Sequence, residues 1–342
     1  MKKLITQRRW KDYLAKRSES QLKANARFAE YRRNKNRAKL GRPQLQRFPK
    51  RKTITLAAPR VFSMVKNPGE TVGLLNNIRR SVRNGNVFVD LSQVQNITPD
   101  AIAGLLSTIH HPDIGDGLIS GNAPEDPSMR RILNESGFRQ YVKSDADLPH
   151  RASLGKIQRH SRSQDILKKK YDQFVAQELV EFAVEKLTGF VGNHPPSYGM
   201  LGDAMLNTMQ HASPQGRPDE LWWASVYFDS ERNVACFTFI DQGVGIFKSR
   251  RLPEKIKLLG KLAVPTNTEI LRRLFRGEIP STTDEPGRGH GIPGMYAHCK
   301  RGTIREFAIL SNDVIGNAES ETYSAVSSHF GGTLLYWEMK LP

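Results

Sequence analysis

Side chains able to bind a metal ion recur every four residues between Ser197 and Ala212. They are Asp203, Asn207 and His211, and a helix would place them along one stripe of its surface. An amide oxygen can enter the coordination shell of Mg²⁺, and a carboxylate one turn away can hold the waters of that shell or polarise an attacking water. The stripe is a candidate metal–phosphate site, although the same spacing occurs in ordinary helices.

A second candidate position is the end of a hairpin predicted from Trp222 to Ile240, where Asp241 leaves a buried strand. A carboxylate in such a place is costly without a partner, and the amino group of adenine would be a fitting one. Gly243 and Gly245 follow, and glycines let the backbone approach a ligand closely. A strand that simply ends in a glycine turn is the alternative interpretation.

A third candidate is the glycine-rich stretch Gly287-Arg288-Gly289-His290-Gly291, which precedes a predicted helix. Alternating glycines expose backbone N–H groups to phosphate, and a helix N-terminus adds positive potential. The stretch has neither the Gly-Lys-Ser/Thr ending of a Walker motif nor the spacing of a Rossmann motif. Its position favours a ligand role for Arg288 and His290.

In order and spacing these pieces resemble the GHKL superfamily of ATP-binding domains, which includes gyrases, heat-shock chaperones, mismatch-repair ATPases, histidine kinases and anti-sigma serine kinases. The resemblance extends from about Ile166 to the C-terminus and includes a strand that begins at Gly332-Thr333. It implies that Asn207 ligates Mg²⁺, that Asp241 recognises adenine and that Thr333 shares a water with that carboxylate. It also implies a lid hinged at two glycines and a phosphate cradle made by three others, namely Gly243, Gly245, Gly287, Gly289 and Gly291.

Two positions depart from the pattern of that superfamily. Asp203 stands where the ATPase branches carry a glutamate general base, so hydrolysis is expected to be slow or to need rearrangement. Gln210 replaces a cation that many of the kinases have. The phosphate charge would then be met by His211, Arg288 or His290, or by a lid rich in Lys and Arg between residues 247 and 286. That basic lid could equally be a solvated face.

The N-terminal half predicts a smaller α/β layer between Thr53 and Lys143. A strand around Val89 is followed by a helix opening at Thr98-Pro99-Asp100, where Thr98 can cap the helix and Asp100 suits its dipole. A second strand near residues 118–120 and a second helix from about residue 126 complete the alternation. This segment resembles a STAS domain, the fold of anti-sigma-factor antagonists, but it lacks the serine that a kinase phosphorylates there. A fixed interaction surface is therefore expected.

The expected organisation is an α/β protein of two domains. Residues 1–52 form a basic arm that is helical or disordered, 53–143 the STAS-like domain, 144–165 a linker with little structure of its own, and 166–342 a GHKL α/β sandwich. Of the net charge of +18, residues 1–52 carry +16, because they hold 19 Lys or Arg against three acidic residues. Such an arm can bind nucleic acid or another polyanion, or remain a solvated extension.

The composition excludes several classes of protein. The sequence contains no run of about 18 apolar residues, which a transmembrane helix would require. No membrane association is therefore expected. Cys236 and Cys299 are the only cysteines, and they do not have the spacing of a zinc site or a disulfide framework. A cytoplasmic location is the expectation.

The leading hypothesis is a nucleotide-responsive switch that binds ATP and Mg²⁺ and whose lid closure controls contact with a protein partner. A serine/threonine kinase of the anti-sigma type is one alternative. Another is an ATP-dependent nucleic-acid-associated protein that uses the basic arm and whose dimerisation ATP controls. Whether the γ-phosphate is hydrolysed, transferred or left intact stays open, as does a homodimer. No histidine stands in the context of an autokinase phosphoacceptor.

Overall fold

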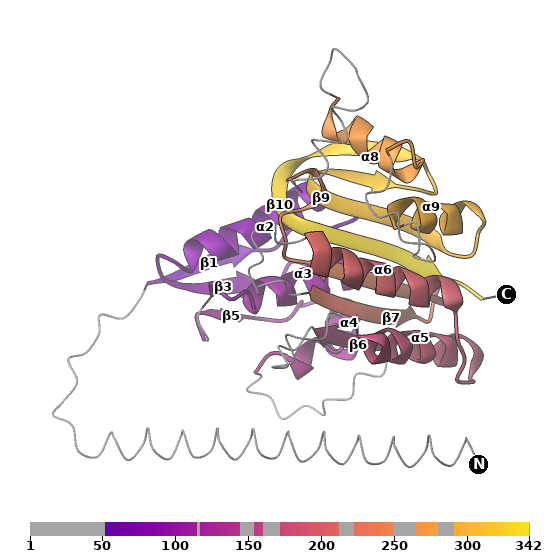
Figure 1. Ribbon diagram of the computed structural model, residues 1–342. Helices are drawn as coiled ribbons and strands as arrows, with labels where there is room; N and C mark the ends of the chain where they lie inside the picture. Colours follow the sequence, from indigo (N-terminus) through magenta and orange to yellow (C-terminus); the bar gives the residue numbers. More distant parts are fainter. Residues whose placement is uncertain are drawn as a thin grey trace, which may run out of the picture. The chain divides into compact units, whose positions relative to one another are not determined.

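The computed structural model describes residues 52–114, 117–143, 154–159, 172–211, 222–248, 265–279 and 291–341. Residues 1–51 of the predicted basic arm, most of the predicted linker, residues 249–264 and 280–286 of the predicted lid and residues 287–290 of the glycine-rich stretch lie outside these ranges. Residues 51–342 belong to one compact unit. This unit is a mixed α/β structure with a three-stranded parallel sheet and a five-stranded antiparallel sheet (Figure 1).

The N-terminal layer consists of the parallel sheet, a short two-stranded pair and their helices. The sheet has the order β1-β3-β5, and β2 pairs with β4. The strands are β1 (Thr53–Ala57), β2 (Val61–Phe62), β3 (Asn86–Asp90), β4 (Asn96–Ile97) and β5 (Ile119–Gly121). The helical elements are α2 (Pro68–Ser81), α3 (Pro99–Ile109), α4 (Pro127–Glu135) and the 3₁₀ turn η1 (Phe138–Gln140). The alternation of strands and helices predicted here is confirmed.

The start of α3 differs from the expectation in its details. The Thr98 side chain does not cap the helix; its hydroxyl donates to the backbone oxygen of Phe62 (3.3 Å). Asp100 is buried, and its carboxylate accepts hydrogen bonds from the backbone N–H groups of Met64 (2.6 Å) and Val65 (3.1 Å). Burial raises the pKa of Asp100, and these hydrogen bonds oppose the rise. Asp100 therefore fixes the segment before α2 against α3.

The second layer is the antiparallel sheet, in the order β6-β7-β8-β10-β9. Its strands are β6 (Gly155–Arg159), β7 (Trp222–Asp229), β8 (Val234–Asp241), β9 (Arg305–Asn317) and β10 (Thr322–Met339). The helical elements of this half are α5 (Gln173–Thr188), α6 (Pro195–His211), the 3₁₀ turn η2 (Ile246–Lys248), α8 (Asn267–Phe275) and α9 (Ile292–Lys300). The predicted β7–β8 hairpin is confirmed. The expectation of little structure in the linker is wrong for residues 155–159, because β6 pairs with β7.

Both faces of the antiparallel sheet are covered, and this explains why every residue of β8 is buried. One face packs against α5, α6, α8 and α9, and the other against α2 and α3 of the N-terminal layer (Figure 1). Alternate residues of a strand point to opposite faces. Phe237 and Phe239 therefore belong to the hydrophobic core between the sheet and α5, α6, α8 and α9. Cys236 and Ile240 belong to the core between the sheet and the N-terminal layer. The two predicted domains consequently share a hydrophobic core.

Candidate functional site

Helix α6 lies on the face of the sheet opposite the N-terminal layer. Proline occupies its first two positions, 195 and 196, where a missing N–H costs nothing. The indole Nε1 of Trp337 in β10 donates to the hydroxyl of Ser197 (3.1 Å), which ties the start of the helix to the sheet. The inward flank expected from the sequence is buried, namely Met200, Leu201, Ala204, Met205 and Thr208.

The candidate metal-binding stripe lies beside this buried flank. Asp203 and Asn207 are both partly exposed. Asp203 takes part in at least one polar or electrostatic interaction. For the side chain of Asn207, by contrast, the described residues provide no hydrogen-bond partner. His211 is the last residue of α6, and its side chain lies outside the described part of the molecule.

Asp241 ends β8 as predicted, and it is only 8% exposed. Its Oδ1 accepts a hydrogen bond from the backbone N–H of Gly243 (2.7 Å). Burial raises the pKa of Asp241 to about 6, against the opposing effect of hydrogen bonds from Gly243 and Thr333. A carboxylate has about four acceptor sites, so these contacts leave it able to accept a further donor.

Three polar side chains form a row across the sheet at the level of this carboxylate. Thr333 of β10 pairs in register with Asp241 of β8 on one side and with Ser311 of β9 on the other. The hydroxyls of Ser311 and Thr333 are 3.4 Å apart. The same face of these strands is otherwise apolar, with Phe239, Ile309 and Leu335 two residues away along each strand. The row thus places hydrogen-bonding groups next to apolar side chains, the combination that lines ligand sites in proteins.

The loop that follows Asp241 is held by two residues of β9. Ser311 Oγ accepts a hydrogen bond from the N–H of Ile246 (2.9 Å), and Asn312 Oδ1 accepts one from the N–H of Phe247 (3.2 Å). Asn312 Nδ2 also donates to the backbone oxygen of Val244 (2.9 Å). Sequence reasoning missed Ser311 and Asn312, although a polar pair that interrupts the apolar stretch before it was a usable signal.

Two glycines near the site are required by the space around them. Gly245 has a φ of +80°, and a Cβ there would lie 2.5 Å from the side chain of Asn312. At Gly332 a Cβ would lie 2.2 Å from the backbone oxygen of Asp241. The first glycine allows the loop to turn beneath β9, and the second allows β10 to lie directly against the end of β8. Gly243 lies between Asp241 and Gly245, and its N–H is the one that binds the carboxylate.

The end of the glycine-rich stretch lies at the start of α9. Gly291 is the residue before the helix and has a φ of +55°. Among the described residues, a Cβ on Gly291 would meet nothing within 4 Å. Gly287, Arg288, Gly289 and His290 lie outside the described residues.

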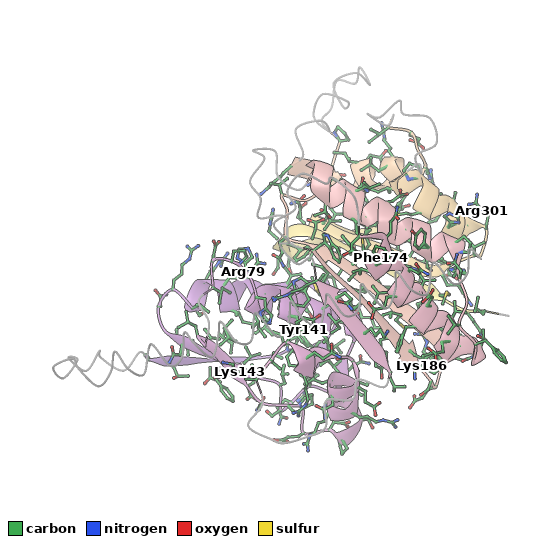
Figure 2. The ribbon with its side chains drawn as sticks, turned by 60° about the horizontal axis from the view of Figure 1, so that its bottom comes forward. Arg79, Tyr141, Lys143, Phe174, Lys186 and Arg301 are labelled. Carbon is green, nitrogen blue, oxygen red and sulfur yellow. The ribbon has the colours of Figure 1, made fainter. Side chains whose placement is uncertain are left out.

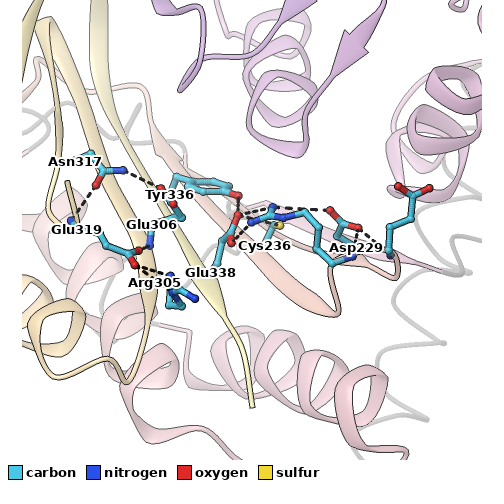
Figure 3. Close-up of polar contacts among 10 residues, drawn as sticks. Asp229, Cys236, Arg305, Glu306, Asn317, Glu319, Tyr336 and Glu338 are labelled. Atoms are coloured by element: carbon cyan, nitrogen blue, oxygen red, sulfur yellow. Dashed lines mark hydrogen bonds and ion pairs between the residues drawn. The ribbon is translucent and has the colours of Figure 1, made fainter. Parts of the chain in front are cut away.

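A separate cluster of ionisable groups lies at the far end of β8 and β10 and has a structural role (Figure 3). Arg232 donates through both terminal nitrogens to the buried carboxylate of Glu338 (2.8 and 2.6 Å), and the Tyr336 hydroxyl donates to the same group (2.6 Å). Burial raises the pKa of Cys236 to about 12. The thiol is therefore protonated near neutral pH, and it is no nucleophile.

Across the described residues, no group of three or more His, Cys, Asp or Glu side chains could hold a metal ion by itself. The same part of the chain has no helix with the length and apolar character needed to span a bilayer. No model of a known protein family matches the chain, and no curated protein is significantly similar to it. Its function must therefore be inferred from the geometry of the site.

Proposed function

We propose that this protein binds ATP with Mg²⁺ and acts as a regulatory switch, in which closure of a lid over the nucleotide controls contact with a protein partner. The observation that carries the proposal is the buried carboxylate of Asp241 at the end of β8. Its pKa is raised to about 6 by burial, which means that the folded protein maintains a charged group at a cost near neutral pH. Such a cost at a strand end favours a ligand role over a structural one.

Adenine fits the chemistry of the polar row. The exocyclic amino group of adenine would donate to Asp241, and Thr333 would share a water with that carboxylate and a ring nitrogen. The neighbouring Phe239 and Leu335 are buried on the same face and make the surroundings of the row apolar. Gly243 and Gly245 would hinge the segment that leads from the adenine site into the lid.

Magnesium would be held by Asn207 together with phosphate oxygens and water. Mg²⁺ binds through few protein oxygens when it accompanies a nucleotide, so the lack of a larger acidic cluster among the described residues is compatible with it. Asp203, one turn earlier on α6, would hold or polarise water next to the metal. Gly291 and the residues before it, with Arg288, His290 and His211, would face the phosphates.

We place residues 166–342 with the GHKL ATP-binding domains and residues 53–143 with the STAS-like domains. An antiparallel sheet with α5 and α6 on one face, a carboxylate at the end of β8 and a threonine opposite it on β10 support the first assignment. A parallel sheet followed by helices supports the second. The union of the two in one core favours a switch whose output is a change in protein contacts.

The proposal is tested with full-length protein by titration calorimetry with ATP, with and without Mg²⁺. We expect binding that weakens when EDTA is added and when Asn207→Ala is introduced. Affinity purification of partners with wild type and Asn207→Ala, each with and without ATP, then tests the switch. The same partners in all four samples would remove support for nucleotide control, and no ATP binding by wild type would refute the proposal as a whole.

Turnover is decided by following the γ-phosphate. Release of phosphate alone would indicate an ATPase. Transfer to a partner would indicate a protein kinase of the anti-sigma type. Because Asp203 is one methylene shorter than a glutamate base, we expect any release to be slow.

A further inference from the structure

Consecutive residues at the end of β8 point to opposite faces of the sheet. Asp241 continues the series of Phe237 and Phe239, which faces α5 and α6. Gln242, the first residue after β8, lies on the side of Ile240, which faces the N-terminal layer, because its side chain contacts Arg79 of α2. Gln242, which follows the proposed adenine-binding residue Asp241, therefore faces the N-terminal layer.

Helix α2 contacts that residue directly. Arg79, labelled on α2 in Figure 2, donates a hydrogen bond through Nη2 to Oε1 of Gln242. Within the described residues, Nε of Arg79 and Nε2 of Gln242 are buried and lack hydrogen-bond partners. Burial lowers the pKa of Arg79, and the charge of Asp113 opposes this effect; an arginine stays charged in proteins. The energy of this poorly compensated cation depends on where the Gln242 amide lies.

A second route joins α2 to the same loop, one turn earlier on the helix. Asn76 Nδ2 donates to the backbone oxygen of His329 in β10 (2.8 Å). His329 Nε2 lies 3.4 Å from Nδ2 of Asn312, which in turn donates to the backbone oxygen of Val244 (2.9 Å). Both ends of the segment 242–244 are thereby connected to one face of one helix.

Helix α2 is pressed against β10 at two further points. A Cβ on Gly69 would lie 2.7 Å from Ser327 Oγ, and one on Gly73 would lie 3.2 Å from Ser328 Oγ. The two glycines therefore let the helix backbone lie close to the strand. Closely packed segments transmit displacements to one another.

We propose that α2 couples the N-terminal layer to the adenine-binding loop, so that a displacement of either one changes the position of the other. Arg79 and Asn76 are positioning residues: they hold the segment 242–244, whose Gly243 N–H orients the Asp241 carboxylate. This coupling rests on the proposed function, since it concerns the same nucleotide site. Thermodynamic linkage makes this coupling reciprocal. If a protein partner that displaces α2 changes the affinity for ATP by some factor, ATP changes the affinity for that partner by the same factor.

The helix provides its own matched controls, because each positioning residue has an exposed neighbour of the same type. Arg79→Ala is compared with Arg80→Ala, and Asn76→Ala with Asn77→Ala, by titration of the full-length protein with ATP and Mg²⁺. We expect the dissociation constant to rise about 3- to 10-fold for the two inner variants, in line with modest allosteric couplings. The two outer variants should stay within about twofold of wild type, as surface substitutions usually do.

A second measurement needs no variant. Amide hydrogen exchange of residues 68–81 in wild type, with and without ATP and Mg²⁺, should slow on binding, although α2 packs on the face of the sheet opposite to α5 and α6. If wild type binds ATP, the inner variants bind it like the outer ones and exchange in α2 is unchanged, the coupling is refuted and the proposed function stands. If wild type binds no ATP, the proposed function and the coupling both fail.

Discussion

Replacing Asp241 with asparagine should strengthen the fold and weaken nucleotide binding. The carboxylate is 8% exposed, and burial raises its pKa from 3.8 to about 6. A difference of about two pKa units corresponds to about 3 kcal/mol by which ionisation at neutral pH disfavours the folded state. Asparagine is nearly the same shape and keeps an oxygen that can accept the Gly243 N–H.

The sign of the pH dependence follows from the proton count. Between pH 3.8 and about 6 the folded protein binds more protons at Asp241 than the unfolded chain does. The free energy of unfolding of the wild type therefore falls as the pH rises through this window and is constant, for this group, above it. Asp241→Asn lacks the titration. We expect it to be about 1–3 kcal/mol more stable than wild type at pH 7, and the gain to vanish near pH 4.

The stability assay is urea unfolding at several pH values between 4 and 7, with Glu231→Gln as control. Glu231 is exposed in the β7–β8 turn, so this variant makes the same change of charge without a change in burial and should stay within about 0.5 kcal/mol of wild type. An Asp241→Asn protein that is less stable than wild type at pH 7, or whose difference from it does not vary with pH, would show that the carboxylate is not desolvated.

The same variant is used in the binding assay, where we expect a loss of ATP affinity in contrast to the gain in stability. An amide nitrogen cannot accept a hydrogen bond from the adenine amino group, and hydrogen bonds to charged groups contribute about 1.5–3 kcal/mol. The affinity for ATP should fall about 10- to 150-fold. Unchanged affinity would remove Asp241 from adenine recognition.

Three further variants test the surroundings of the site. Gly332→Ala should cost about 1–3 kcal/mol of unfolding free energy, because its Cβ would overlap a backbone oxygen at 2.2 Å, whereas Gly331→Ala meets nothing within 4 Å and serves as its control. Asn312→Ala should speed amide exchange in residues 244–247, because it removes hydrogen bonds to the loop and places alanine at a φ of +53°. Unchanged exchange would mean that the loop conformation does not depend on Asn312. Arg232→Ala should cost about 1–3 kcal/mol in urea unfolding without affecting ATP affinity, because it leaves the buried carboxylate of Glu338 without its cation at the far end of the sheet.

The sequence predicted the elements that carry a local signal. The turn between β7 and β8, the start of α3 at Pro99 and the end of β8 at Asp241 all follow from residue types within a few positions of each other. The inward flank of α6 followed from helical spacing. These features depend on short-range chemistry, which a single sequence displays.

Features created by the meeting of distant segments were not predicted. Ser311 and Asn312 matter only because β9 lies beside β10, which places them under a loop more than 60 residues earlier in the chain. β6 was hidden in a polar stretch because an edge strand needs few apolar residues. Asp100 was predicted only to suit the dipole of its helix, and it also binds backbone groups some 35 residues away. In each case a tertiary partner determines the role of the residue.

The position of β10 has a consequence for biosynthesis. This strand, residues 322–339, lies between β8 and β9 in the sheet and also covers one face of α2. The apolar surfaces of segments synthesised far earlier therefore stay uncovered until residues 322–339 have left the ribosome. We expect the nascent chain to depend on chaperones until then, and a premature stop codon shortly before residue 322 to yield an aggregating product rather than a shortened folded protein.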